Sequence, residues 1–159
     1  MKRIAALVCL IGAGAVATGV ALADRGGGGH GKGARHGHAI HVIEHATTDS
    51  ISNQGGGAGD AVGNILTFSN DVFDASNSTK VGSDQGYCVR LIVGESWECN
   101  YTTLLAHGQI TVEGPFYDTR DSVLAVTGGT GAYANVRGSL ELRSRSGGTE
   151  YDFIFHLIG

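Results

Sequence analysis

Two cysteines in this sequence are placed so that they could form a disulfide bond. Cys9 lies in an N-terminal leader, described below, whose removal would leave the even pair Cys88 and Cys99. An even number of cysteines is typical of chains that fold in an oxidising compartment. The segment between them should form a hairpin, and a turn centred on Val93-Gly94 would place the two cysteines directly opposite each other. A turn shifted by one residue would offset them by two positions on the same face. We therefore predict a Cys88–Cys99 disulfide.

Histidines are dense near the N-terminus and could bind a transition metal, because neutral imidazole is a common ligand for zinc, copper and nickel. Their spacing is irregular, and they lack cysteine or carboxylate partners at the spacing of a structural metal site. We therefore expect adventitious metal affinity and no resident metal or other cofactor. Any ligands for a bound metal would be His36, His38 and His41.

The segment Gly129 to Ala134 matches the dinucleotide-binding pattern G-x-G-x-x-A. That pattern holds a pyrophosphate when a helix begins directly at the glycines. Here the residues from Ser139 to Ser144 alternate in polarity as a strand does. We therefore interpret the glycines as a tight turn with positive φ and not as a nucleotide site.

One predicted strand carries an amide on an apolar face. Leu66, Phe68 and Val72 alternate with polar residues, and Asn70 falls on their side of the strand. A buried amide requires a hydrogen-bond partner, such as water or a ligand. A β-bulge or a hydrogen bond to a turn is the alternative explanation of an Asn within a strand. The pattern predicts that Asn70 points inward.

Short runs rich in β-branched and aromatic residues recur along the chain with Gly, Asn, Asp and Ser between them, and none shows a sustained helical stripe. Eight strands are predicted, at Ala39–Ala46, Asn64–Phe73, Lys80–Val93, Ser96–Ala106, Gln109–Glu113, Ser122–Thr127, Ala134–Ser144 and Glu150–Ile158. The last is apolar on both faces, so we expect a neighbouring strand end or another subunit to cover it. Eight strands with short turns favour an all-β, closed antiparallel up-and-down barrel, whose interior holds side chains or one small ligand.

The sequence divides into three parts. Residues 1–23 are a predicted secretory signal peptide, with Lys2 and Arg3 ahead of an apolar run and small residues up to Ala23. Residues 24–38 are rich in Gly and His and should form a disordered tail. Residues 39–159 should form one barrel domain. Cleavage after Ala23 would give a secreted protein with no further membrane insertion.

The predicted barrel domain is acidic. Residues 40–159 contain six Lys or Arg and fourteen Asp or Glu, an excess of eight negative charges. Binding to phosphate backbones depends on clustered cationic side chains. The charge balance therefore argues against nucleic acid as a partner.

Several motifs follow one another in a fixed order. They are Gly63 to Asp74, Val81-Gly82, Gly86-Tyr87-Cys88-Val89, Val112 to Phe116, Asp121 to Gly131 and Arg137-Gly138. The first five resemble segments of plant allene oxide cyclases. The fourth and fifth also resemble dirigent proteins, and Arg137-Gly138 is similar to the end of the dirigent motif. The resemblance spans Val42 to Leu142. It implies an eight-stranded antiparallel barrel, commonly a homotrimer, with an apolar lumen that binds a lipid- or phenol-like small molecule.

The resemblance also suggests functional residues. Val42-Ile43-Glu44 looks like the cyclase segment whose Glu assists epoxide opening, so Glu44 is the candidate catalytic carboxylate. Asn70 corresponds to an Asn that holds a water, and it is the second catalytic candidate. The family's second Asn corresponds to Ala46, and its Ser-Pro is absent, which points away from allene oxide as the substrate. The candidate ligand-binding residues are Phe68, Val72, Phe116 and Tyr117.

Two kinds of function fit these observations. The first is a cofactor-free cyclase or isomerase whose lumen holds an apolar molecule in one conformer, so that ring closure gives one stereoisomer. The second is a secreted carrier that binds a hydrophobic ligand without changing it. A lumen filled by side chains would instead favour a structural surface protein.

Overall fold

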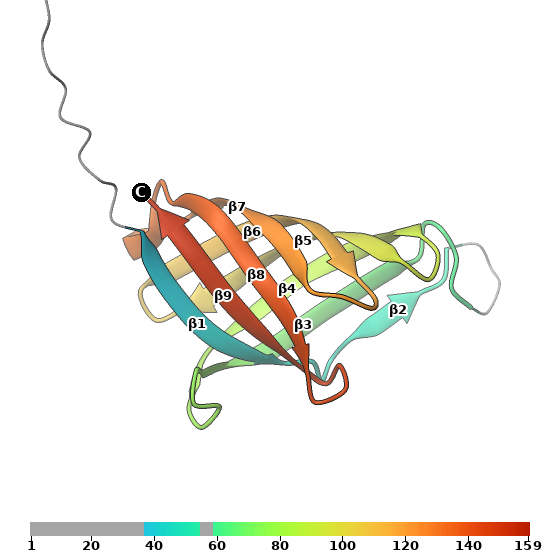
Figure 1. Cartoon of the computed structure of the whole chain (residues 1–159), viewed down its shortest axis with the longest axis horizontal. Coiled ribbons are helices and arrows are strands. Elements are labelled where there is room, and N and C mark those ends of the chain that lie inside the picture. The colour runs from blue at the N-terminus through green and yellow to red at the C-terminus, as the bar shows by residue number, and fades with distance from the viewer. Residues whose placement is uncertain (1–36, 55–58) are drawn as a thin grey trace, which may run out of the picture. The chain divides into compact units, whose positions relative to one another are not determined.

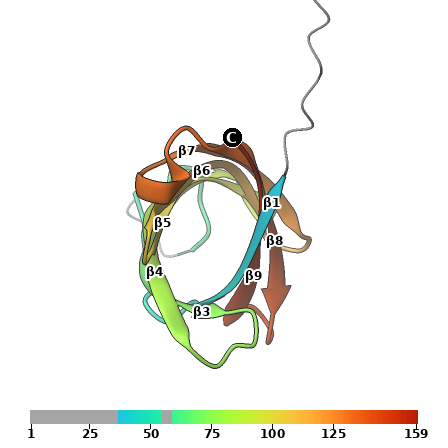
Figure 2. The same ribbon diagram turned by 90° about the vertical axis from the view of Figure 1, so that its left-hand side faces the viewer.

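The computed structural model describes residues 37–54 and 59–159, and in them the chain forms an antiparallel barrel (Figures 1 and 2). The predicted signal peptide and most of the predicted tail lie outside the described residues. The strands are β1 (His38–His45), β2 (Ser50–Ser52), β3 (Ile65–Asp74), β4 (Lys80–Ile92), β5 (Ser96–Leu105), β6 (Gly108–Tyr117), β7 (Ser122–Gly129), β8 (Arg137–Arg145) and β9 (Glu150–Ile158). A single 3₁₀ turn, Gly131–Tyr133, separates β7 from β8 in this described part.

Strand β1 closes the barrel. The strands from β3 to β9 follow one another as an antiparallel meander, and β1 pairs with both of its ends. Its register with β9 runs from His38 opposite Leu157 to His45 opposite Glu150. Its last four residues also pair with the end of β3. The expected eight-stranded closed barrel is therefore confirmed.

Strand β2 extends the wall beyond the end of β1. Ser50–Ser52 pairs with the first residues of β3, whereas β1 pairs with the last. The two short strands thus lie end to end along β3, with residues 46–49 between them. Figure 1 shows β2 beside β3 on the far side of this interruption. The barrel wall is consequently broken at one point, directly beside Asn70.

The interior is formed by one face of each strand, as alternation of polarity predicts. Val72, Ile110, Val112, Leu140 and Phe155 are wholly buried on this face. The apolar last strand, β9, lies between β1 and β8 along its whole length, so both of its edges are paired. Among the described residues, no helix has the length and hydropathy needed to cross a bilayer.

All eight predicted strands are present, and β6 differs most from its predicted range. Strand β6 was expected to end at Glu113, before Gly114-Pro115, but it continues to Tyr117. It stays paired with β5 to its end, whereas its ladder with β7 stops at Glu113 opposite Ala125. A residue without an N–H is tolerated where a strand lacks a neighbour on one side.

The glycine segment after β7 forms a turn, as its sequence indicates. Gly131 has a φ of +60° and begins the 3₁₀ turn. A side chain there would collide with the carbonyl oxygen of His107. Strand β8 follows at Arg137, so the segment has the turn and strand expected of it and not the helix that a dinucleotide site needs.

Candidate functional site

The barrel encloses a cavity of about 60 Å³ that is lined by aromatic and aliphatic side chains. Its lining residues come from seven strands and from the interruption after β1. They are Glu44, Asp49, Leu66, Phe68, Cys88, Cys99, Tyr101, Phe116, Leu142, Tyr151 and Phe153. An engineered cavity of roughly 150 Å³ is enough to bind benzene. This inner cavity therefore holds a compact group, and a larger molecule must extend beyond it.

A larger hollow of about 490 Å³ adjoins the inner cavity at the end of the barrel where β6 meets β7. Phe116, Leu142 and Tyr151 line both spaces. The rings of Phe116 and Tyr151 meet edge to face, with their centroids 5.7 Å apart. This aromatic pair therefore separates the inner cavity from the outer hollow.

Glu44, on β1, provides a buried carboxyl group at the wall of the inner cavity. The residue is 6% exposed, and its Oε1 accepts a hydrogen bond of 2.8 Å from Asn70 Nδ2. Burial raises the pKa of Glu44, and the nearby charge of Asp49 adds to the increase. Hydrogen bonds with Asn70 and Asp84 oppose that increase. Glu44 thus places a buried carboxyl group at the wall of this cavity.

Asp84, on β4, is a second buried carboxyl group directly behind Glu44. It is wholly buried, and burial together with the charge of Glu44 raises its pKa to about 9. A hydrogen bond between the two carboxyl groups raises the pKa of Asp84 and lowers that of Glu44. At neutral pH Asp84 is therefore protonated. Its Oδ1 accepts from the backbone N–H of Asn70, and its Oδ2 has no donor among the described residues. The sequence analysis missed this residue.

A local signal for Asp84 does exist. It lies four residues before Cys88, and alternation places both side chains on the interior face of β4. Gly86, between them, lies opposite Tyr101, and a side chain at Gly86 would collide with the Tyr101 Cβ. The glycine therefore makes room for the tyrosine ring in the lumen.

Asn70, on β3, is buried as expected, but its hydrogen bonds are made within the chain. Its Oδ1 accepts from the backbone N–H groups of Thr47 and Thr48, at 3.1 and 2.9 Å, and from the Thr48 hydroxyl. Its Nδ2 donates to Asp49 and Glu44, at 2.8 Å each. Asn70 thus connects β1 to residues 47–49 in the break of the wall and is not among the residues lining the cavity.

Tyr101, on β5, brings an unpartnered hydroxyl group to the same region. The residue is 3% exposed and lines the inner cavity. Its hydroxyl and that of Thr103 have no hydrogen-bond partner among the described residues. Burial, followed by the charges of Glu44 and Asp84, raises the pKa of Tyr101. The phenol therefore stays protonated and can donate to a bound molecule.

The four predicted ligand-binding residues fall into three places. Phe68 and Phe116 line the inner cavity, and Phe116 lines the outer hollow as well. Tyr117 lines the outer hollow, where the Arg120 guanidinium lies 3.7 Å from its ring centroid. Val72 is wholly buried in the core and is not among the residues lining the inner cavity.

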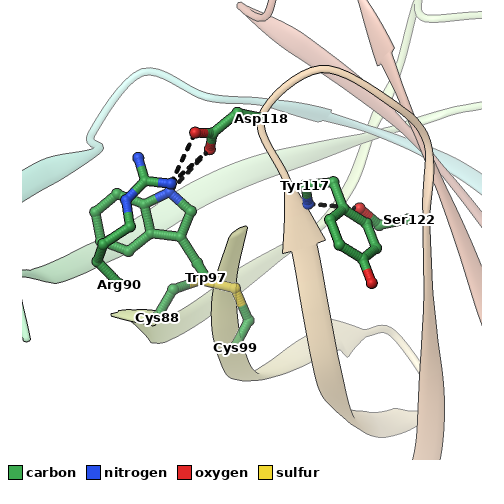
Figure 3. The surroundings of a disulfide bond; sticks show 7 residues. All are labelled: Cys88, Arg90, Trp97, Cys99, Tyr117, Asp118 and Ser122. Carbon is green, nitrogen blue, oxygen red and sulfur yellow. Dashed lines mark hydrogen bonds and ion pairs between the residues drawn. A yellow bond between two sulfur atoms is a disulfide. The ribbon is translucent and has the colours of Figure 1, made fainter. Parts of the chain in front are cut away.

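The predicted Cys88–Cys99 disulfide is present, and both cysteines line the inner cavity. They lie directly opposite each other on β4 and β5, as a turn at Val93-Gly94 requires. Figure 3 shows Arg90 and Trp97 next to the disulfide in this hairpin. The Arg90 guanidinium lies 4.0 Å from the Trp97 ring centroid.

Arg90 is a buried cation that connects three loops at this end of the barrel. Its Nε donates to Asp60 at 2.7 Å, and its Nη1 donates to both oxygens of Asp118 at 2.9 and 2.7 Å (Figure 3). Asp60 also accepts from the backbone N–H of Gly94, and Asp118 accepts from Trp97 Nε1. Arg90 therefore fixes the loop that follows Phe116 and Tyr117.

The candidate metal ligands lie only partly within the described residues. His36 is outside them, whereas His38 and His41 belong to β1. His41 Nε2 lies 2.7 Å from Asp152 Oδ1. Within residues 37–54 and 59–159, no three His, Cys, Asp or Glu side chains are grouped closely enough to hold a metal ion.

Comparison with known proteins places the barrel in a family. The family model for allene oxide cyclase matches residues 40–159. A pyocyanin demethylase structure is similar at a TM-score of 0.65 and 24% identity, over 75% of this chain and 98% of that one. A pterocarpan synthase dirigent protein is similar at a TM-score of 0.65 and 15% identity, over 77% and 94% of the two chains.

A third similar structure is the Diels–Alderase AbmU from Streptomyces koyangensis, with a TM-score of 0.60 and 12% identity, over 80% of this chain and 71% of that one. At these identities the solved structures show a shared fold. The family model matches more than half of the chain and therefore shows which family it belongs to. The chain belongs to the allene oxide cyclase family.

Proposed function

We propose that this protein binds an apolar small molecule in its lumen and, without a cofactor, directs the cyclization or isomerization of that molecule. One observation carries the proposal. The Glu44 carboxyl group is buried at the wall of an otherwise apolar cavity, with a second carboxyl group, Asp84, directly behind it. Such a pair stabilises positive charge that develops on a bound molecule in a low-dielectric site.

The two carboxyl groups have different roles in this proposal. Glu44 lines the cavity and faces the reacting molecule, either as a fixed negative charge or by accepting a proton from it. Asp84 holds a proton and acts through Glu44, so the pair can accept a proton and return it within one intramolecular reaction. The surrounding side chains exclude water and restrict the molecule to one conformer.

Proteins with the same fold support this class of function. They include an enzyme named for pyocyanin demethylation, a dirigent protein of pterocarpan synthesis and a Diels–Alderase. The disulfide supports the further proposal that this chain is secreted, because structural disulfides persist outside the reducing cytosol.

The test begins with the molecule that the protein retains. Native mass spectrometry of protein purified without added ligand identifies that molecule, and incubation with the same compound in excess is followed by chiral chromatography. We expect wild-type protein to convert it to one stereoisomer. Glu44→Gln should abolish conversion or stereocontrol, whereas Glu98→Gln, an equal change of charge on the exposed face of β5, should not. Unchanged product chirality in folded Glu44→Gln would contradict the proposal.

A carrier function is the second candidate, and Asn70 is the observation that favours it. The amide that would hold a water in a cyclase is bound on both sides by the chain itself. A carrier would release its retained molecule chemically unchanged, both from wild-type protein and from Glu44→Gln.

A further inference from the structure

The inner cavity combines aromatic walls with acidic groups. Its aromatic residues are Phe68, Tyr101, Phe116, Tyr151 and Phe153. Its charged residues are Glu44 and Asp49, and in the described part of the chain no Lys, Arg or His lines it. We propose that this cavity recognises an organic cation, with a compact positively charged head inside and a larger body in the outer hollow. The inference rests on the proposed function, because it names the class of molecule that the same lumen binds.

The aromatic walls favour a positive head group. The faces of aromatic rings attract cations, most strongly where water is excluded. Tyr101 and Phe153 pack with their centroids 5.6 Å apart, as do Phe68 and Tyr101. Phe116 and Tyr151 complete the enclosure on the side of the outer hollow. A neutral group of the same shape would gain only the burial of its apolar surface.

The polar groups of the cavity favour the same head group. Glu44 is buried at its wall, Asp49 contributes from the exposed interruption after β1, and Asp84 lies behind Glu44. Tyr101 is only 3% exposed, and its hydroxyl group has no hydrogen-bond partner among the described residues. Its oxygen can accept a hydrogen bond from an ammonium N–H, which recovers part of the free energy that a buried hydroxyl group without a partner costs.

The sizes of the two spaces define the shape of the molecule. The inner cavity of about 60 Å³ holds a head group of a few atoms, whereas the outer hollow of about 490 Å³ holds a larger body. Phe116, Leu142 and Tyr151 line both, so one molecule can extend through both spaces when the Phe116 and Tyr151 rings part.

The charge of the whole barrel guides a cation towards this entrance. Residues 40–159 carry eight more acidic than basic side chains, and a net charge of this size attracts oppositely charged molecules over long range. Arg90, the buried cation at this end, is paired with Asp60 and Asp118. The second cation there, Arg120, lines the outer hollow together with Asp118 and Asp121, so the lining of the hollow still carries one more negative than positive side chain.

The test compares phenyltrimethylammonium with tert-butylbenzene, which has the same shape and a carbon atom in place of the charged nitrogen. Binding of each to the full chain is measured by calorimetry and by NMR of the aromatic resonances. We expect the cation to bind about tenfold more tightly, or better. Glu44→Gln should remove most of this preference, and Glu98→Gln should retain it. Equal or tighter binding of tert-butylbenzene would overturn the inference.

Proton release provides a second readout. Glu44 is faced by Asn70, Asp84, Asp49 and His45, and Asp84 by Glu44, Asp49 and the Asn70 backbone. A cation in the cavity favours the ionised form of both carboxyl groups, so binding should release protons and tighten as pH rises. Calorimetry in buffers of different ionisation enthalpy measures the release. Binding of the cation without proton release in any buffer would contradict its placement beside Glu44.

If Glu44→Gln does not fold, substitution of an aromatic residue that lines the cavity tests the inference instead. Tyr151→Leu, at a half-buried position, should weaken binding of the cation and leave that of tert-butylbenzene nearly unchanged; an equal effect on both would overturn the role of the rings. This outcome differs from a failure of the proposed function, in which the molecule retained by the protein is returned unchanged whatever its charge.

Discussion

Asn70 and Glu44 are joined by a hydrogen bond of 2.8 Å that connects the break in the barrel wall to the buried carboxyl group of the lumen. The other side of the same amide holds the backbone of Thr47 and Thr48. The position of Glu44 and the path of the chain between β1 and β2 therefore depend on one side chain.

Replacement of Asn70 by Ala should destabilise the barrel. The buried Glu44 carboxyl group would lose the amide that donates to it, at a cost of about 1–3 kcal/mol, whereas the N–H groups of the exposed Thr47 and Thr48 can bind water. We therefore expect a loss of about 2 kcal/mol in the free energy of unfolding. Urea denaturation followed by circular dichroism measures it. Asn53→Ala, at an exposed position, is the control and should change little. A loss below about 0.5 kcal/mol for Asn70→Ala would show that the interruption is held by other contacts.

Asp84 should make the protein less stable as pH rises. Its pKa in the folded protein is about 9, above the ordinary value of 3.8, so between these values the folded state binds more protons than the unfolded state. Stability is then highest below the unfolded pKa and falls as pH rises towards 9, by up to about 1.4 kcal/mol per pH unit. Asp84→Asn should flatten this dependence in urea denaturation from pH 5 to pH 8. Asp121→Asn, which is exposed, should keep the wild-type slope.

Arg90→Ala should loosen the loops around the outer hollow. It leaves Asp60 and Asp118 without their shared cation and removes the group stacked on Trp97. Because both aspartates are partly exposed, we expect a loss of about 2 kcal/mol, with faster proteolysis within residues 117–122. Arg90→Lys keeps the charge but not the planar fork and should be intermediate. Arg143→Ala, which breaks an exposed ion pair with Glu141, should be nearly neutral.

The disulfide should contribute to stability by restricting the unfolded chain. Cys88 and Cys99 are separated by 11 residues, and a loop of this length corresponds to about 3 kcal/mol in the chain-entropy model. The double variant Cys88→Ser, Cys99→Ser should lose that amount in urea denaturation. Wild-type protein in reducing agent should approach the same value, and equal stability of the oxidised and reduced forms would contradict the prediction.

The strands were predictable because each has one apolar face and is bounded by turn-forming residues. β2 lacked that signal, since Ser50–Ser52 has three exposed residues and no apolar face. Asp84 was missed for a related reason. It lies among Gly82, Ser83, Gln85 and Gly86, where small and polar residues hide the alternation that places it inside.

The case of Asn70 shows where a pattern in one strand stops being informative. Alternation correctly placed its amide on the inward face of β3. Its partners, however, lie 21 to 26 residues earlier in the chain, in a segment that passes beside β3 only because β1 and β2 are interrupted there. The hydrogen bonds of a side chain depend on that path, which local sequence does not encode.

The pairing of β1 with both β9 and β3 also bears on the order of folding. The seven strands that follow can form a meander from local hairpins, but this open sheet has two unpaired edges. Both edges are covered only when the earliest strand reaches the latest, across more than a hundred residues of chain. Newly made molecules are therefore most exposed to aggregation in the interval before β1 pairs with both edges. Deletions reaching into residues 38–45 would prolong this interval.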